Sequence, residues 1–157
     1  MIRFFKRMIN ILQNKIQKMK GLDMLRDRFQ ILIVDDVIHN LIALNALLAS
    51  DEVNISQAMS GNEALDLMLK QDFSLALLDV QMPDMSGFEL AKFMHGINKT
   101  KNIPIIFVTA AEKEKNYFFK GLESSAVDYL QKPLDPATLK NKVNVFLELH
   151  RQKLKKR

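Results

Sequence analysis

Short apolar runs alternate with longer amphipathic stretches over most of the chain, from about residue 29 to residue 149. A short apolar run that ends at turn-forming residues is typical of a strand buried on both faces of a sheet. Pro104 lies in one run, near the first residue, where a strand tolerates proline. The pattern predicts five strands, at residues 30–34, 53–58, 75–79, 103–108 and 127–130.

Between these runs, apolar residues recur every three or four positions, which is the spacing of an amphipathic helix. Ser60 and Ser86 are each followed three residues later by glutamate, the spacing of a capping box at a helix start. Asp135 and Pro136 supply a cap and a first residue for the last helix. The predicted helices are 37–49, one from 61 onward, 87–97, 112–122 and one from 136 into the C-terminal tail.

Five consecutive strand–helix units predict an α/β fold with a parallel sheet and helices on both faces. The first, third and fourth strands are apolar throughout, so we place them inside the sheet, whereas the mixed second and fifth strands fit its edges. The order 2-1-3-4-5 satisfies both conditions. The prediction is a doubly wound, flavodoxin-like (βα)5 fold with an extra N-terminal amphipathic helix.

The N-terminal segment has its own pattern, in which apolar residues follow a strict 3-4-3-4-3 spacing. They are Ile2, Phe5, Ile9, Leu12, Ile16 and Met19. This is a short heptad seam, and we expect the helix to end at Gly21. It packs either on its own domain or on a second copy, or it lies in a membrane interface with Phe4 and Phe5 among headgroups and its lysines on anionic lipid. The strict seam and a narrow apolar face favour helix packing.

The predicted organisation is a basic amphipathic helix and linker at 1–28, a globular domain at 29–149 and a basic helix extension at 150–157. Charge follows this division. Residues 1–20 carry six Lys or Arg and no acid, residues 151–157 carry five, and the remainder has 12 Lys or Arg against 18 Asp or Glu. An acidic body is not typical of a nucleic-acid-binding domain, so we expect no nucleic-acid partner.

The chain contains no cysteine, which excludes disulfides, thiolate catalysis and Cys-ligated zinc. No run approaches the ~18 apolar residues that a membrane span needs. Charged residues also interrupt the N-terminus where a signal peptide would be apolar. These observations favour a cytoplasmic protein.

Chemically capable side chains stand at the ends of four predicted strands. Asp35 and Asp36 follow the first strand, Asp79 ends the third, Thr109 follows the fourth and Lys132 follows the fifth. In a 2-1-3-4-5 sheet the three aspartates meet at the switch point between the first and third strands. Two carboxylates ~4 Å apart repel by ~4 kcal/mol at an effective dielectric constant near 20, so such a cluster recruits a cation or raises its pKa values.

Carboxylate oxygens suit Mg²⁺, and a carboxylate aimed at an open site beside a metal and a lysine is a competent nucleophile for a phosphoryl group. Lys132 and the Thr109 hydroxyl could each bind one phosphoryl oxygen. The strand ends therefore indicate phosphoryl transfer.

Residues 30–149 resemble a response regulator receiver domain, the phosphoaccepting module of two-component signalling. The matching motifs are IVDD at 33–36, LLDVQMP at 77–83 with Gly87, VTA at 108–110 and DYLQKP at 128–133. The resemblance implies that Asp79 accepts a phosphoryl group from a phosphohistidine on a histidine kinase or a histidine phosphotransfer protein.

It further implies that Asp36, Asp79 and the Gln81 backbone carbonyl bind Mg²⁺, or alternatively Mn²⁺, with Asp35 assisting. Thr109 and Tyr129 would form a switch, in which Tyr129 swings inward and remodels the face made by the fourth helix, fifth strand and fifth helix of the domain. Homodimerisation through that face or through the N-terminal helix stays open.

Such a domain catalyses only its own phosphorylation and dephosphorylation, so we do not expect an enzyme in the ordinary sense. An Mg²⁺-dependent aspartyl phosphatase of the haloacid dehalogenase type is one alternative, but its general acid would stand at Gln81. A non-phosphorylated interaction module is the other. The intact set Asp36, Asp79, Thr109 and Lys132 argues against that module.

Overall fold

The computed structural model describes residues 1–110 and 126–156, without the side chains of 21–26, 126 and 127. Five parallel strands form one sheet in the order β2-β1-β3-β4-β5, as predicted. The strands are β1 (Phe29–Val34), β2 (Val53–Ala58), β3 (Leu75–Asp79), β4 (Ile105–Thr109) and β5 (Ala126–Gln131). The described helices are α1 (Ile2–Asp27), α2 (Ile38–Leu48), α3 (Gly61–Lys70), α4 (Gly87–His95) and α6 (Pro136–Lys155).

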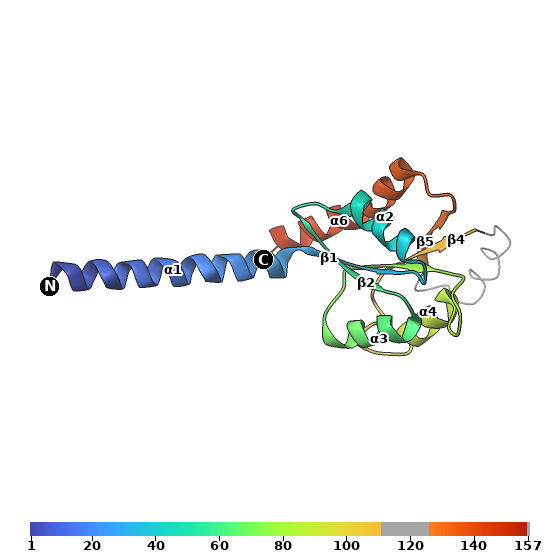
Figure 1. Cartoon of the computed structure of the whole chain (residues 1–157), viewed down its shortest axis with the longest axis horizontal. Helices are drawn as coiled ribbons and strands as arrows, with labels where there is room; N and C mark the ends of the chain where they lie inside the picture. Colours follow the sequence, from blue (N-terminus) through green and yellow to red (C-terminus); the bar gives the residue numbers. More distant parts are fainter. Residues whose placement is uncertain (111–125, 157) are drawn as a thin grey trace.

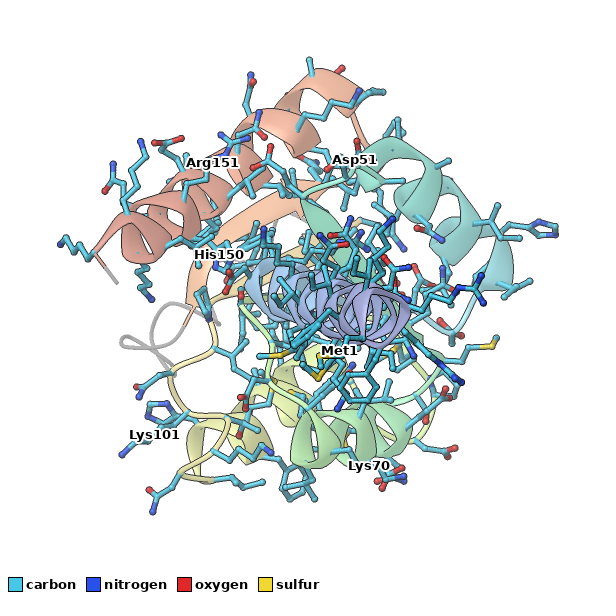
Figure 2. All side chains as sticks on the ribbon, turned by 90° about the vertical axis from the view of Figure 1, so that its left-hand side faces the viewer. Met1, Asp51, Lys70, Lys101, His150 and Arg151 are labelled. Carbon is cyan, nitrogen blue, oxygen red and sulfur yellow. The ribbon has the colours of Figure 1, made fainter. Side chains whose placement is uncertain are left out.

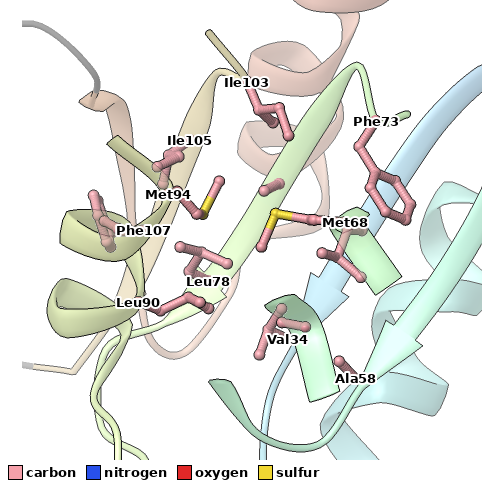
Figure 3. Packing of buried hydrophobic residues seen from close by; sticks show 14 of the residues in the cluster. Val34, Ala58, Met68, Phe73, Leu78, Leu90, Met94, Ile103, Ile105 and Phe107 are labelled. Carbon is pink, nitrogen blue, oxygen red and sulfur yellow. The ribbon is translucent and has the colours of Figure 1, made fainter. Parts of the chain in front are cut away.

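Helices cover both faces of the sheet, with α2 and α6 on one face and α3 and α4 on the other (Figure 1). The central strands are buried on both sides because successive side chains point to opposite faces. In β1, Leu32 and Val34 pack with α3 and α4, whereas Ile31 and Ile33 pack with α2 and α6. Figure 3 shows the core on the α3–α4 face. This two-sided burial accounts for the continuous apolar runs.

Side-chain caps begin three helices at the places that the sequence predicts. The hydroxyl oxygens of Ser60 and Ser86 accept the backbone N–H groups of Glu63 and Glu89 at 3.1 Å and 3.2 Å. Asp135 accepts the N–H of Thr138 at 3.0 Å at the start of α6. Each cap satisfies an otherwise unpaired N–H in a first helical turn.

Several predicted boundaries differ from the structure by a residue or more, and three of them have an identifiable physical reason. The helix α1 continues through Gly21 to Asp27, because an interior glycine costs only about 1 kcal/mol relative to alanine and does not break a helix. The strand β4 begins at Ile105, since Pro104 has no N–H to donate to the ladder, although its carbonyl accepts the Ala76 N–H. The helix α4 ends at His95 with Gly96 as its C-cap. The predicted helix 112–122 lies outside the described residues.

The helix α1 does not pack on its own domain, which corrects one of the three interpretations of this segment. Residues 1–20 are exposed throughout, and α1 projects away from the sheet (Figure 1). Its base contacts the domain, where His150 Nε2 lies 2.6 Å from the Asp27 carbonyl oxygen. Among the described residues, no helix is long and apolar enough to cross a membrane.

Candidate functional site

Three aspartate side chains converge where β1 and β3 end. Asp35 and Asp36 follow β1, Asp79 is the last residue of β3, and Val34 pairs with Leu78 in the parallel ladder. One carboxylate oxygen from each aspartate lies within 4.8 Å of the other two. Asp35 and Asp79 are 2% and 4% exposed, so this negative charge is concentrated in a poorly solvated place.

Lys132 brings a positive charge to the cluster from the far edge of the sheet. Its Nζ lies 3.1 Å from Asp79 Oδ1 and 3.9 Å from Asp35 Oδ2. The backbone N–H of Lys132 donates to the Thr109 carbonyl at 2.9 Å, which continues the β4–β5 ladder by one residue beyond Gln131. The end of β5 is thereby fixed so that the lysine side chain reaches across β4 to the aspartates.

Asp35 is held in place by hydrogen bonds from the start of α2. Its Oδ1 accepts the Val37 N–H at 2.9 Å, and its Oδ2 accepts the Asn40 side-chain amide at 3.0 Å. The sequence reasoning did not identify Asn40. Its position, in the first turn of the helix that follows two aspartates, is the signal that could have indicated it.

The electrostatics of the cluster fit a divalent cation. Burial raises the pKa of the Asp79 carboxyl, the Lys132 hydrogen bond opposes this, and the charges of Asp35 and Asp36 raise it further. Among the described residues, Lys132 is the one cation in ion-pair contact with these carboxylates. Three carboxylates against one ammonium leave two negative charges, and oxygen-only ligands are those that Mg²⁺ and Mn²⁺ accept.

Thr109 and Tyr129 lie on the two strands beyond β3. Thr109 ends β4 at the same edge of the sheet as Asp79 and is 1% exposed. Tyr129 is 6% exposed, and its ring centroid lies 5.8 Å from that of Phe107 in the core on the α3–α4 face. This burial raises the pKa of Tyr129 to about 12. The tyrosine ring therefore occupies an inward position in this structure.

The loop after β3 carries Gln81, which is exposed, and returns to the strand at Gly87. The Gly87 N–H donates to the Val80 carbonyl at 2.9 Å. A β-carbon on Gly87 would collide with the Asp79 carbonyl oxygen and lie 3.1 Å from the Val80 Cα. Glycine is thus required here because two backbone segments approach closely, directly behind the aspartate.

Gly87→Ala is expected to destabilise the fold by about 1 to 3 kcal/mol, because the atoms in the way belong to the backbone and the loop must shift. Gly96→Ala is the matched control. A β-carbon there would make only ordinary contacts at 3.7 Å, so we expect a change within about 1 kcal/mol. Urea unfolding measures both, and equal stability of the two variants would refute the close approach.

A cavity of about 330 Å³ adjoins the cluster. Polar groups of Asp35, Asn40 and Lys132 line one part of it. Apolar side chains of α2 and of the segment after β5 line the rest, among them Leu44, Leu47 and Leu134. The cavity therefore extends from the side chains of Asp35 and Lys132 along α2.

The chain is similar to several known proteins. A sequence profile of the response regulator receiver domain matches residues 31–144. Response regulator PleD of Caulobacter vibrioides is 36% identical over 110 residues, which make up 70% of this chain and 24% of that protein. Transcriptional regulatory protein ZraR of Escherichia coli is 38% identical over 112 residues, 71% of this chain and 25% of that protein. A probable cyclic di-GMP phosphodiesterase of Vibrio cholerae is 34% identical over 145 residues, 92% of this chain and 32% of that protein.

The matched region is thus a quarter to a third of the length of these relatives. Solved structures match over most of their own length. Chemotaxis protein CheY4 of Vibrio cholerae has a TM-score of 0.68 and 29% identity, and the match covers 76% of this chain and 98% of that one. A CheY-like receiver domain protein of Methanospirillum hungatei has a TM-score of 0.69 and 30% identity, covering 80% and 98%. The sheet order, the converging aspartates and the profile match together show that this chain belongs to the response regulator receiver domain family.

Proposed function

We propose that this chain is a phosphoaccepting signalling switch in which Asp79 takes a phosphoryl group from a phosphohistidine. The donor would be a histidine kinase or a histidine phosphotransfer protein, and the location would be cytoplasmic. The observation that carries the proposal is the placement of Asp79, which is buried, bonded to Lys132 at 3.1 Å and flanked by two further aspartates.

In the proposed reaction an oxygen of Asp79 attacks phosphorus, and the bond between phosphorus and the donor's imidazole nitrogen breaks. The phosphoryl group becomes an acyl phosphate, and the imidazole leaves with the electron pair of that bond. Lys132 Nζ already lies beside the attacking carboxylate, so its ammonium can follow the negative charge onto a phosphoryl oxygen. The hydroxyl of Thr109, at the same sheet edge, would donate to another phosphoryl oxygen.

Asp36, Asp79 and the Gln81 carbonyl would hold a Mg²⁺ or Mn²⁺ ion. When bound, the ion would supply the positive charge that neutralises phosphoryl oxygens as the carboxylate attacks. Asp35 would assist from a supporting position, since both of its oxygens already accept hydrogen bonds from the start of α2. The three carboxylates give the site the excess negative charge that such an ion requires.

Thr109 and Tyr129 would form the switch. Thr109 ends β4, and Tyr129 lies near the carboxyl end of β5, the edge strand next to it. A change of charge at Asp79 can therefore be passed through Thr109 to the surface beside β5. Phosphorylation would bias two states that differ in this surface, to which β5 and α6 would contribute. A downstream partner or a second copy would recognise the favoured state.

The cavity beside Lys132 suggests how a donor protein approaches. Apolar side chains that are exposed or half-buried line this cavity, and they are Ala43, Leu47, Pro133 and Leu134. Apolar side chains of a donor could cover this patch while its phosphohistidine enters toward Asp79. Charge alone would not hold such a complex, so apolar contact is the expected source of affinity.

The experiment is to incubate the protein with Mg²⁺ and acetyl phosphate and to record the intact mass. We expect a gain of one phosphoryl group, which neutral hydroxylamine removes because it cleaves acyl phosphates. With EDTA in place of Mg²⁺, the gain should disappear. A folded protein that gains no phosphoryl group with Mg²⁺ and donor present would contradict the proposal.

A further inference from the structure

The first twenty residues of the chain present an apolar surface that no other described part of the chain covers. All of them are exposed, although the segment is a continuous helix that stands clear of the domain (Figure 1). Large apolar side chains here are 42% to 74% exposed, apart from the terminal methionine. They are Ile2, Phe4, Phe5, Met8, Ile9, Ile11, Leu12, Ile16 and Met19. Exposure of this extent indicates a binding surface.

The apolar side chains occupy about half of the helix circumference, at roughly 100° per residue. This is wider than the six-residue seam suggests, because Phe4, Met8 and Ile11 extend the face to one side of it. The narrow face expected from the heptad spacing is therefore wrong. A half-circle of apolar residues matches a helix that lies flat in an interface, one side in an apolar medium and one in water.

The opposite half of the helix is polar and carries positive charge only. Residues 1–20 contain no aspartate or glutamate. The basic residues on this half and at its borders are Arg3, Lys6, Arg7, Lys18 and Lys20. Lys15 falls within the apolar half, where a long stem can lie along an apolar surface while the ammonium reaches water. A polar face that carries only positive charge favours a negatively charged binding partner.

A second copy of α1 fits these observations less well than a lipid surface does. In a two-stranded coil built on the 3-4 seam, Phe4 and Ile11 stand away from the partner helix and would stay in water. Two such helices also bring like charges together. In a parallel pair, Lys15 of one helix would face Lys20 of the other, which is unfavourable.

We infer that α1 binds flat on a bilayer that contains anionic phospholipid, with its apolar half among the acyl chains and its basic half at the headgroups. The end of α6 adds to this charge. It lies beside the base of α1, where His150 contacts Asp27 (Figure 2). Lys153, Lys155 and Lys156 at this end are exposed. This inference does not depend on the chemistry at Asp79.

The test is flotation of the full chain with vesicles of two compositions. One contains phosphatidylcholine alone, and the other contains equal parts of phosphatidylcholine and phosphatidylglycerol. We expect binding to the second and at least tenfold weaker binding to the first. Raising the salt concentration should release the protein, since screening shortens the reach of the headgroup charge. Equal binding to both compositions, or to neither, would overturn the inference.

Two sets of substitutions separate lipid binding from pairing. Phe4→Ser with Ile11→Ser removes apolar area that lies off the seam, so vesicle binding should fall at least tenfold. Arg3→Gln, Lys6→Gln and Arg7→Gln together should lower it by roughly a hundredfold, at about fivefold per basic residue. Asn10→Ser with Asn14→Ser, on the polar half, is the matched control and should bind as the unaltered chain does.

The rival result is a dimer. The mass in solution without lipid is expected to be that of one chain. A dimer that the Phe4→Ser and Ile11→Ser pair leaves intact, together with vesicle binding that the pair does not reduce, would overturn the inference in favour of a coiled coil. Residues 1–20 do not contribute to the core, so these variants should still take up phosphate from acetyl phosphate. Loss of vesicle binding and loss of phosphorylation are therefore distinguishable.

Discussion

Asp79→Asn is expected to abolish phosphoryl uptake, because the amide oxygen is a far weaker nucleophile than the carboxylate it replaces. The side chain keeps its shape and can still accept a hydrogen bond from Lys132. Incubation with acetyl phosphate and Mg²⁺, followed by intact-mass measurement, should show no modified protein. Asp66→Asn, at an exposed pair with Lys70, should be phosphorylated as the unaltered chain is. Equal uptake by the Asp79 and Asp66 variants would remove Asp79 from the proposed role.

The same substitution is expected to stabilise the fold at neutral pH, on the order of 1 kcal/mol in the absence of divalent cations. Burial and the neighbouring aspartates raise the pKa of the Asp79 carboxyl in the folded chain, so folding disfavours its ionised form. A carboxyl whose pKa is raised in the folded chain lowers the free energy of unfolding as pH increases from the ordinary value, near ~3.9, through the raised value. Well below ~3.9 it has no such effect.

The gain from Asp79→Asn should therefore be full at pH 7 and vanish in acid. Urea unfolding at both pH values measures it. A variant that is less stable than the unaltered chain at pH 7 would show that the Lys132 ion pair outweighs burial and repulsion.

Lys132→Met is expected to slow phosphorylation by about a hundredfold or more. Methionine keeps much of the apolar stem but removes the ammonium that lies 3.1 Å from Asp79, and removal of one charge-stabilising donor typically costs that much. The rate of mass gain with acetyl phosphate at saturating Mg²⁺ is the measurement. A loss of stability should accompany the change, since the buried carboxylates of Asp79 and Asp35 lose their cation.

Lys142→Met is the matched control for that variant. Lys142 pairs with Asp128 at 2.7 Å, and its side chain is 30% exposed against 31% for Lys132. Both substitutions therefore remove a lysine of similar exposure from an ion pair, but the carboxylate that loses its partner is 38% exposed at Asp128 and 5% exposed at Asp79, and only Lys132 contacts the aspartate cluster. A similar loss of rate in both variants would attribute the effect to general destabilisation and contradict the proposed role of Lys132.

The fold was predictable because the apolar pattern of each strand depends on its own burial, and because parallel strands all end at the same edge of the sheet. Three strands buried on both faces must be continuously apolar, and Val34 and Leu78 show why, as each packs into a helix layer while its neighbours face the other. The strands β2 and β5 have mixed polar and apolar composition, and they occupy the two edges of the sheet. The convergence of the aspartates follows from that order, since parallel neighbours end at the same edge.

Other features depend on contacts that spacing does not encode. The amide of Asn40 reaches Asp35 only because the first turn of α2 folds back over the carboxylate. The need for Gly87 comes from the approach of the backbone at Asp79, eight residues earlier. Gly21 was expected to end α1, but glycine lowers helix stability without fixing an end when no cap or proline follows. The sequence also did not predict that α1 stands clear of the domain, because heptad spacing does not show which surface the apolar face contacts.

Reductive trapping tests the central claim most directly. Borohydride converts an aspartyl phosphate to homoserine, and peptide mapping then locates the modified residue. After phosphorylation with Mg²⁺ and acetyl phosphate, we expect homoserine at residue 79 and none at residues 35 or 36. Homoserine at either of those two positions, or none in a protein that has gained a phosphoryl group, would contradict the account.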